Sequence, residues 1–289
     1  MGGGTPDNAI IWGQRTYIMG ILNVTPDSFS GDGLAGGETA VTRAVAQAQQ
    51  FVADGADIID IGGESTRPGS EPVSEAEELA RILPVVTAVR QSVSAAISVD
   101  TYRANVAEAA LAAGANWIND VWGLRMDAAM APLIAKTGCP VVIMHNRSQP
   151  KNVAQAQRLG GRYVGIHYDD LLADVTHELE ESISIARLAG VQNWQIILDP
   201  GIGFGKTVAQ NVQLLNHLDH FKKMGFPILI GPSRKSFIGY TLDLPPDQRV
   251  EGTAATVAIG IDRGADVVRV HDVQVMARVA RMTDQIVRK

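Results

Sequence analysis

Carboxylate, amide and ammonium side chains stand at the ends of several short apolar segments of this chain, and their chemistry suits a polar heterocyclic ligand. The group comprises Asp100, Asn119, Asp199 and Lys235. Its two carboxylates only accept hydrogen bonds, its amide both donates and accepts, and its ammonium only donates. Such a set complements a ring that carries amino, ring N–H and carbonyl groups. Because burial of unpaired charge is costly, repetition of this pattern predicts a binding site and not a structural accident.

Basic side chains at similar positions predict an anion-binding function. They are Arg67, Arg234, Arg269 and His271. The whole chain carries a net charge of -6 at pH 7, so an anionic ligand such as a phosphate needs a local positive cluster. Backbone amides of a helix that begins near residues 233–236 offer a second site for a carboxylate or phosphate, unless Ser233 simply caps that helix.

The segments that position these residues are eight short apolar runs. They span residues 17–23, 57–62, 96–100, 117–121, 141–145, 195–199, 228–231 and 267–271. Runs without clean alternation are typical of strands buried on both faces, and the helical spacing between them predicts a parallel sheet. We expect an α/β fold, a (β/α)8 TIM barrel, since an open sheet would expose two edges. Barrel closure brings the carboxyl ends of all strands to one mouth.

Length and composition favour one domain over residues 1–289. With 289 residues and 46% hydrophobic content, the chain suits a barrel, which commonly takes about 250 residues. We expect residues 1–16 to form a short hairpin extension that covers the amino-terminal end of the barrel. The connection 146–168 has the least regular pattern, and long connections are often functional.

Composition also restricts the partners and the location of the protein. Basic residues are dispersed along the chain, which argues against a nucleic-acid-binding face. The sequence contains neither a polybasic segment nor a run of about 18 apolar residues, so it does not predict membrane attachment. Residues 1–8 lack the basic and apolar regions of a secretory signal. Cys139 is the only cysteine, which suits a reducing compartment. We therefore expect a cytoplasmic protein that acts on small molecules.

Longer motifs surround the polar residues. They are NVTPDSF at 23–29, GGESTRPG at 62–69, SVDT at 98–101, IND at 118–120, MH at 144–145, LDPG at 198–201, SRKS at 233–236 and RVHD at 269–272. In this order they resemble the signatures of the dihydropteroate synthase family of pterin-binding enzymes, and the resemblance extends from about Tyr17 to the carboxyl terminus. Two stretches depart from the family pattern: residues 30–34, and the connection after residue 147, which is longer than usual.

The resemblance implies an alkyl-group transferase of folate biosynthesis. Such an enzyme condenses 6-hydroxymethyl-7,8-dihydropterin pyrophosphate with p-aminobenzoate, yields 7,8-dihydropteroate and pyrophosphate, uses Mg2+ and is a sulfonamide target. It also implies a homodimer formed through helices late in the barrel, such as the apolar segment 253–261. Loops 23–35 and 63–73 are expected to be mobile and to order over the site.

Roles of individual residues follow from the same resemblance. The pterin is expected to contact Asp100, Asn119, Asp199 and Lys235. The pyrophosphate is expected to contact Asn23, Arg67, Arg269 and His271, and Asn23 is also the expected Mg2+ ligand. The p-aminobenzoate site is expected to contain Phe29, Thr66, Arg67, Pro68, Phe204 and Ser236. The expected catalytic residues are Asp100, Lys235, Arg269 and His271.

Two other functions remain open at this point. A pterin-binding methyltransferase that serves a corrinoid protein shares the barrel and the Asp and Asn strand ends, but it leaves the motifs at 23–29, 233–236 and 269–271 unexplained. A barrel that binds pterin without catalysis is the second, although every polar position of the motif set is present. Turnover with pyrophosphate release distinguishes a synthase from both.

Overall fold

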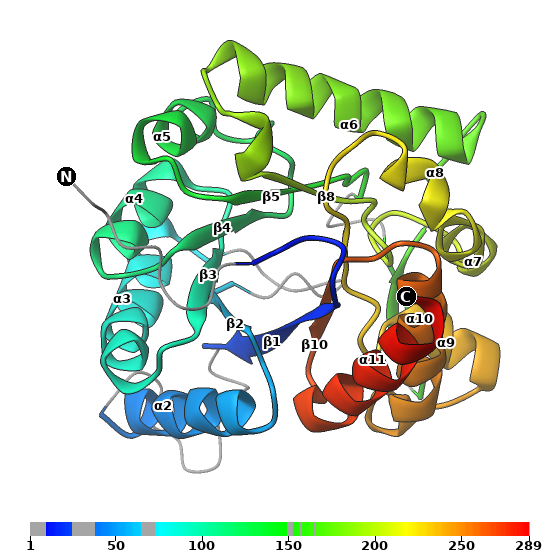
Figure 1. Ribbon diagram of the computed structural model, residues 1–289, viewed down its shortest axis with the longest axis horizontal. Coiled ribbons are helices and arrows are strands. Elements are labelled where there is room, and N and C mark those ends of the chain that lie inside the picture. Colours follow the sequence, from blue (N-terminus) through cyan, green and yellow to red (C-terminus); the bar gives the residue numbers. More distant parts are fainter. Residues whose placement is uncertain are drawn as a thin grey trace.

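The predicted parallel strands form a barrel (Figure 1). The computed structural model describes residues 10–24, 38–64, 73–148, 153–156, 158–164 and 166–288. Its barrel strands are β1 (Tyr17–Asn23), β2 (Ile58–Gly62), β3 (Ala96–Asp100), β4 (Trp117–Asp120), β5 (Val141–Met144), β8 (Ile196–Asp199), β9 (Leu229–Ile230) and β10 (Val267–Val270). Each pairs with its neighbour in chain order, β10 returns to β1, and a parallel bridge between Leu198 and Ile228 joins β8 to the start of β9. The predicted (β/α)8 barrel is therefore confirmed.

Helices cover the outside of these strands, as Figure 1 shows. They are α2 (Glu38–Ala53), α3 (Glu75–Ser92), α4 (Ala104–Ala112), α5 (Met130–Thr137), α6 (Leu171–Leu188), α7 (Val208–Asn216), α8 (Leu218–Lys222), α9 (Ser236–Leu242), α10 (Val250–Asp262) and α11 (Val273–Val287). The helices pack against the strands through one cluster of buried apolar side chains, whose first member in the chain is Ile18 and whose last is Ala280. Among the described residues, none of the helices combines the length and the apolar character required to cross a lipid bilayer.

Inside the barrel, apolar and polar layers follow each other along the strands. Alternate residues of a strand face the same side. The layer nearest the amino-terminal strand ends is apolar and consists of Tyr17, Met19, Ile58, Trp117, Val142, Ile197, Leu229 and Val267. Two residues further along four of these strands stand Asp60, Asn119, Asp199 and Arg269. The barrel interior is therefore apolar towards the amino-terminal strand ends, which we call the lower interior, and polar at the carboxyl ends of the strands, which form the mouth.

Residues 10–16 contact the apolar layer at the amino-terminal end of the barrel. Ile10 and Trp12 pack against it, and the Trp12 ring meets Tyr17 and Trp117 edge to face, with ring centroids 5.7 and 6.2 Å apart. This described part is a turn without a strand, and the hairpin expected over residues 1–16 stays a prediction. Residues 1–9 lie outside the described residues.

A strand pair that the sequence did not predict lies in the connection between β5 and α6. Strands β6 (Val153–Ala156) and β7 (Gly160–Tyr163) pair antiparallel as a hairpin. Glycines at 160 and 161 are poor strand formers, and both strands are short, so no apolar alternation indicated them. The structure thus corrects the expectation of an irregular connection. The hairpin packs beside α9, near the mouth of the barrel.

Asp284 joins α11 to the beginning of β1, and its removal should destabilise the barrel. Its carboxylate accepts from the Thr16 backbone N–H and the Thr16 hydroxyl, both at 2.8 Å, and from Arg288 Nε at 2.8 Å. We expect Asp284→Ala to lower the free energy of unfolding by about 1–3 kcal/mol in urea denaturation, because buried donors lose their acceptor.

Glu108→Ala is the matched control, since Glu108 pairs with Lys136 and both side chains are largely exposed. Exposed ion pairs contribute little to stability, so this variant should unfold at nearly the same urea concentration as the parent. Equal losses in the two variants would contradict the proposed role of Asp284.

Candidate active site

Arg269 lies between two buried carboxylates at the mouth of the barrel. Its Nε donates to Asp60 Oδ2 at 2.6 Å, and its Nη2 donates to Asp100 Oδ2 at 2.7 Å. Asn119 Nδ2 donates to the same oxygen of Asp60 at 3.2 Å. Strand register produces this arrangement, because Asp100 on β3 stands opposite Gly62 on β2 and Asn119 on β4. Residues from four strands therefore form one hydrogen-bonded group.

Burial and charge act in opposite directions in this group. Burial raises the pKa of Asp100 to about 7, although the Arg269 cation acts in the opposite direction. Burial disfavours the Arg269 cation, but the adjacent Asp60 and Asp100 carboxylates outweigh that effect and raise its pKa. Asp100 is thus a carboxyl group whose protonation can respond to a bound ligand near neutral pH.

Asp199 and Lys235 form a second polar group that borders the first. Asp199 Oδ1 accepts from the Gly201 N–H at 2.7 Å, and Lys235 Nζ donates to the Ile202 carbonyl. Burial lowers the pKa of Lys235 to about 7 against the opposing charge of Asp199. A Cβ placed on Gly231 would lie 3.8 Å from Arg269 Cβ and 4.0 Å from Lys235 Nζ, so both basic groups border the same glycine.

The loop after β8 brings Phe204 beside Lys235. Lys235 Nζ lies 4.2 Å from the centroid of the Phe204 ring, which is a cation–π distance. Gly203 has a φ of +84° and a Cβ there would collide with the Lys235 side chain. Glycine is therefore required at this position for both the backbone conformation and the space that Lys235 occupies.

Lys206 holds the loop after β8 through contacts of its ammonium group with backbone carbonyls of that loop. Its buried Nζ lies 2.9 Å from the carbonyls of Gly201 and Phe204 and 3.0 Å from His145 Nδ1. Burial lowers the pKa of Lys206 to about 7, with Asp199 acting in the opposite direction. The three acceptors match the three N–H groups of an ammonium, so this side chain fixes the backbone that carries Phe204.

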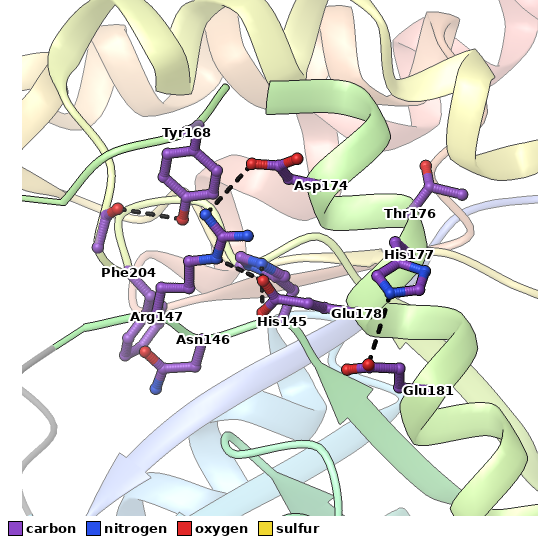
Figure 2. Close-up of polar contacts among 12 residues, drawn as sticks. His145, Asn146, Arg147, Tyr168, Asp174, Thr176, His177, Glu178, Glu181 and Phe204 are labelled. Atoms are coloured by element: carbon purple, nitrogen blue, oxygen red, sulfur yellow. Dashed lines mark hydrogen bonds and ion pairs between the residues drawn. The ribbon is translucent and has the colours of Figure 1, made fainter. Parts of the chain in front are cut away.

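His145 connects Lys206 to Glu178 on α6, and Figure 2 shows His145 beside Glu178. Burial, together with the Lys206 cation, lowers the pKa of His145 to about 4. A neutral ring accepts at Nδ1, and its Nε2 lies 3.3 Å from Glu178 Oε2. Glu178 also pairs with Arg147 and, at 3.3 Å, with Arg125. This chain of contacts ties the loop after β8 to the outer helices.

In the segment 233–236, Ser233 does not cap the helix that follows, although the sequence allowed that role. Ser233 Oγ accepts from the His271 N–H at 3.1 Å and lies 2.9 Å from His271 Nδ1. Lys235, and not Ser233, occupies the N-cap position of α9, which begins at Ser236. Arg234 donates from Nε to Asp272 at 2.8 Å, so its charge is already paired with a carboxylate.

Most of the predicted site residues that the structure describes meet at this mouth. Asp100, Asn119 and Arg269 share one network, and Asp199 and Lys235 adjoin it. Phe204 and His271 lie on the neighbouring loops, and Ser236 is the first residue of α9. Asn23 Oδ1 borders Gly62, as does Asp100. Phe29, Thr66, Arg67 and Pro68 lie outside the described residues, as do most of loops 23–35 and 63–73.

Two buried residues of the site were missed from the sequence. Asp60 lies inside the apolar run 57–62. A carboxylate at an inward position of a buried strand is a pattern that could have identified it as a site residue. Lys206 follows a glycine-rich loop in which local spacing does not show that the lysine is buried. Neither residue ends one of the apolar runs, so the pattern of polar strand ends does not include them.

Comparisons with known proteins agree with this geometry. The family model for pterin-binding enzymes matches residues 19–271. The dihydropteroate synthase of Clostridium beijerinckii is 50% identical over 278 residues, which cover 96% of each chain. The structure of the Clostridium difficile dihydropteroate synthase in the presence of pteroic acid has a TM-score of 0.89 at 47% identity and covers 97% of this chain and 100% of that chain. The Xanthomonas albilineans synthase with 4-aminobenzoic acid has a TM-score of 0.84 at 41% identity and covers 94% of this chain and 93% of that chain.

The neutral His145 ring should make the protein sensitive to acid. Its pKa is about 4 in the folded protein against an ordinary 6.5, so the unfolded chain takes up this proton first. The contribution of His145 to the free energy of unfolding is fully present above pH 6.5. As the pH falls towards 4, the free energy of unfolding decreases by up to about 3 kcal/mol.

His145→Gln isolates this effect, because glutamine can accept from Lys206 and does not titrate. The raised pKa values of Asp100 and Asp120 act in the opposite direction, so the measured quantity is the difference in unfolding free energy between wild type and variant. We expect wild type to lose stability relative to His145→Gln between pH 6.5 and 4. A pH-independent difference would show that His145 is not held neutral.

Proposed function

This chain belongs to the pterin-binding enzyme family and, within it, to the dihydropteroate synthases, and we propose that it condenses 6-hydroxymethyl-7,8-dihydropterin pyrophosphate with p-aminobenzoate. The products are 7,8-dihydropteroate and pyrophosphate, which makes the protein a transferase of folate biosynthesis. One observation carries the proposal: Asp100, Asn119, Asp199 and Lys235 border one polar mouth in a barrel whose lower interior is apolar.

The pterin ring is bound by groups of matching hydrogen-bond character. Asp100 and Asp199 accept from ring N–H and amino groups, Lys235 donates to a ring carbonyl or nitrogen, and Asn119 can do either. Because Asp100, Asn119 and Asp199 are buried, a ligand that left them unpaired would bind poorly. The site therefore selects for a heterocycle with several polar edges.

The reaction exchanges one bond to the pterin methylene carbon for another. The carbon–oxygen bond to pyrophosphate breaks, the neutral amine of p-aminobenzoate forms the new carbon–nitrogen bond, and the nitrogen then releases one proton. Arg269 and His271 stabilise the departing pyrophosphate, and Asp100 stabilises positive charge that develops on the pterin. No strong general base is needed, so the main contribution of the protein is positioning.

Arg269 is preorganised for this task by its two carboxylate partners. Asp60 and Asp100 hold its Nε and Nη2, and among the described residues no partner of Nη1 is seen, so we propose that its N–H groups bind an anion. Lys235 contacts the pterin from the Asp199 side of the mouth. We propose Asp100, Lys235, Arg269 and His271 as the catalytic residues on this basis.

Mg2+ fits the oxygen atoms near the end of β1. A Cβ on Gly62 would lie 3.9 Å from both Asn23 Oδ1 and Asp100 Oδ2, so these oxygens border one glycine. Magnesium prefers oxygen ligands, keeps several waters and commonly binds together with substrate phosphates. We propose Asn23 as the protein ligand and place Asn23, Arg67, Arg269 and His271 around the pyrophosphate. When bound, the ion would neutralise charge on that leaving group.

The p-aminobenzoate site adjoins the pterin site. We assign Phe204 and Ser236 to it, together with Phe29, Thr66, Arg67 and Pro68, which lie outside the described residues. We further propose a cytoplasmic homodimer formed through the late helices, supported by the exposed side chains of Ile259 on α10 and of Val275 and Met282 on α11. The Yersinia pestis synthase has been crystallised with a sulfonamide drug, and we propose that this chain is likewise a sulfonamide target.

Turnover by the purified protein tests the proposed function. Pyrophosphate release should require Mg2+, the pterin pyrophosphate and p-aminobenzoate together, and mass spectrometry should identify dihydropteroate. Asp100→Asn should lower kcat/KM by about 100-fold, because it removes a charge that stabilises the transition state. Asp169→Asn, on an exposed side chain, is the control for charge removal. Pterin binding without turnover in the wild type would instead indicate a binding protein.

Chelation tests the metal assignment. EDTA should abolish pyrophosphate release, and added Mg2+ should restore it. Asn23→Ala should raise the Mg2+ concentration for half-maximal activity by roughly 10-fold or more. Calorimetric binding of 6-hydroxymethyl-7,8-dihydropterin, which lacks the pyrophosphate, should be unchanged in this variant. Full activity in EDTA would refute the assignment.

A further inference from the structure

The β6–β7 hairpin brings an aromatic ring to the site that the proposed mechanism does not use. Tyr163, the last residue of β7, stacks on Phe204 with ring centroids 6.5 Å apart and an interplanar angle of 26°. Only 9% of Tyr163 and 7% of Phe204 is exposed. The hairpin therefore contributes to the wall of the mouth and is more than a surface connection.

This contact belongs to a small apolar cluster that is separate from the main cores. Its buried members are Val121, Met144, Tyr163 and Phe204, and Trp122 and Val153 pack against them. Val121 follows β4, Met144 ends β5 and Phe204 follows β8, so the cluster lies at the carboxyl ends of barrel strands. The hairpin supplies Val153 and Tyr163 and closes the cluster from outside the barrel.

The other end of the hairpin is attached to the segment that begins α9. Arg249 Nη2 donates to the Leu159 carbonyl at 2.9 Å, and its Nη1 donates to the Arg234 carbonyl at 3.0 Å. A Cβ on Gly239 would collide with this guanidinium, so a glycine is needed for its close approach. The hairpin and the segment that carries Lys235 and Ser236 are thus held by one buried side chain.

A cation–π contact adds to this attachment. Arg162 Cζ lies 5.0 Å from the centroid of the Tyr240 ring, which projects from α9. At the exposed tip of the hairpin, Arg158 Nη1 donates to the Asp243 carbonyl at 2.7 Å. These contacts orient the hairpin relative to α9 and therefore place Tyr163 where it meets Phe204.

Phe204 is thereby fixed on more than one side. Lys206 holds its backbone carbonyl, Lys235 Nζ lies over its ring, and Tyr163 stacks on that ring. Removing Tyr163 would leave the first two contacts in place but would free the ring to turn about its side-chain bonds. A displaced ring would no longer offer the same surface to a flat ligand.

We propose that Tyr163 is a positioning residue for the aryl amine substrate: it holds the Phe204 ring in place, and the hairpin thereby influences which aryl amines the enzyme accepts. This inference rests on the proposed function and on the assignment of Phe204 to the p-aminobenzoate site. Because the ring on which Tyr163 stacks is that of Phe204, we expect its effect to fall on the second substrate more than on the pterin.

Steady-state kinetics with each substrate varied in turn tests this role. In Tyr163→Leu, the KM for p-aminobenzoate should rise roughly 3- to 10-fold, as expected for loss of an aromatic pair, while the KM for the pterin pyrophosphate changes less than about 2-fold. Tyr163→Phe keeps the ring and should restore wild-type values. Lys136→Ala changes an exposed side chain on α5, away from the hairpin, and is the control that should leave both KM values unchanged.

A double-mutant cycle with Phe204→Leu tests whether Tyr163 acts through Phe204. The double variant should have nearly the same KM for p-aminobenzoate as Phe204→Leu alone, because Tyr163 then has no ring to position. Tyr163→Leu should also lower the preference for p-aminobenzoate over 4-amino-2-hydroxybenzoate. Thermal denaturation of every variant shows whether a kinetic change merely follows unfolding.

The outcomes separate this inference from the proposed function. A wild-type protein that forms no dihydropteroate would overturn both. Wild-type turnover with an unchanged p-aminobenzoate KM in Tyr163→Leu, an equal rise in both KM values, or additive effects in the cycle would overturn only the role of Tyr163.

Discussion

A guanidinium group buried between two carboxylates is stable only if all three groups are held in register, because each would be costly to bury alone. Arg269 meets this condition with Asp60 and Asp100, which come from strands β2 and β3 on the other side of β1. The parallel barrel supplies the register, and the apolar layer beneath it keeps water from the lower side. Asn119 completes the group by donating to Asp60. The remaining features of the mouth are arranged around this charged centre.

The two halves of the mouth differ in how they are held. On the Arg269 side, charged hydrogen bonds between strands fix the groups that we propose to face the pterin. On the opposite side, a loop carries Phe204, and buried Lys206 holds that loop through two carbonyls and His145. An aromatic pair with Tyr163 then covers the loop. A heterocycle with many polar edges suits the first half, and a flat aryl amine suits the second.

Tertiary contacts override three local patterns of this sequence. The β6–β7 hairpin was not predicted, because its strands are short, contain glycines and depend on contacts with Arg249 and Tyr240 that lie far along the chain. Ser233 was a plausible N-cap by local pattern, but its hydroxyl contacts His271 instead. Arg234 was expected to add positive charge to the mouth, whereas Asp272 pairs with it. In each case a tertiary contact decided between local possibilities.

The sequence by itself determined the barrel and the chemical character of its mouth. Apolar runs that end in Asp100, Asn119 and Asp199 encode both the strands and their polar ends, because strand formation and side-chain chemistry depend on residues that are neighbours in the chain. Only the tertiary structure decided that Asp60, 209 residues away, is a partner of Arg269, that Lys206 is buried against His145, and that Tyr163 reaches Phe204. The physical reason is that burial and pairing depend on strand register and on packing between distant segments, which local spacing does not specify.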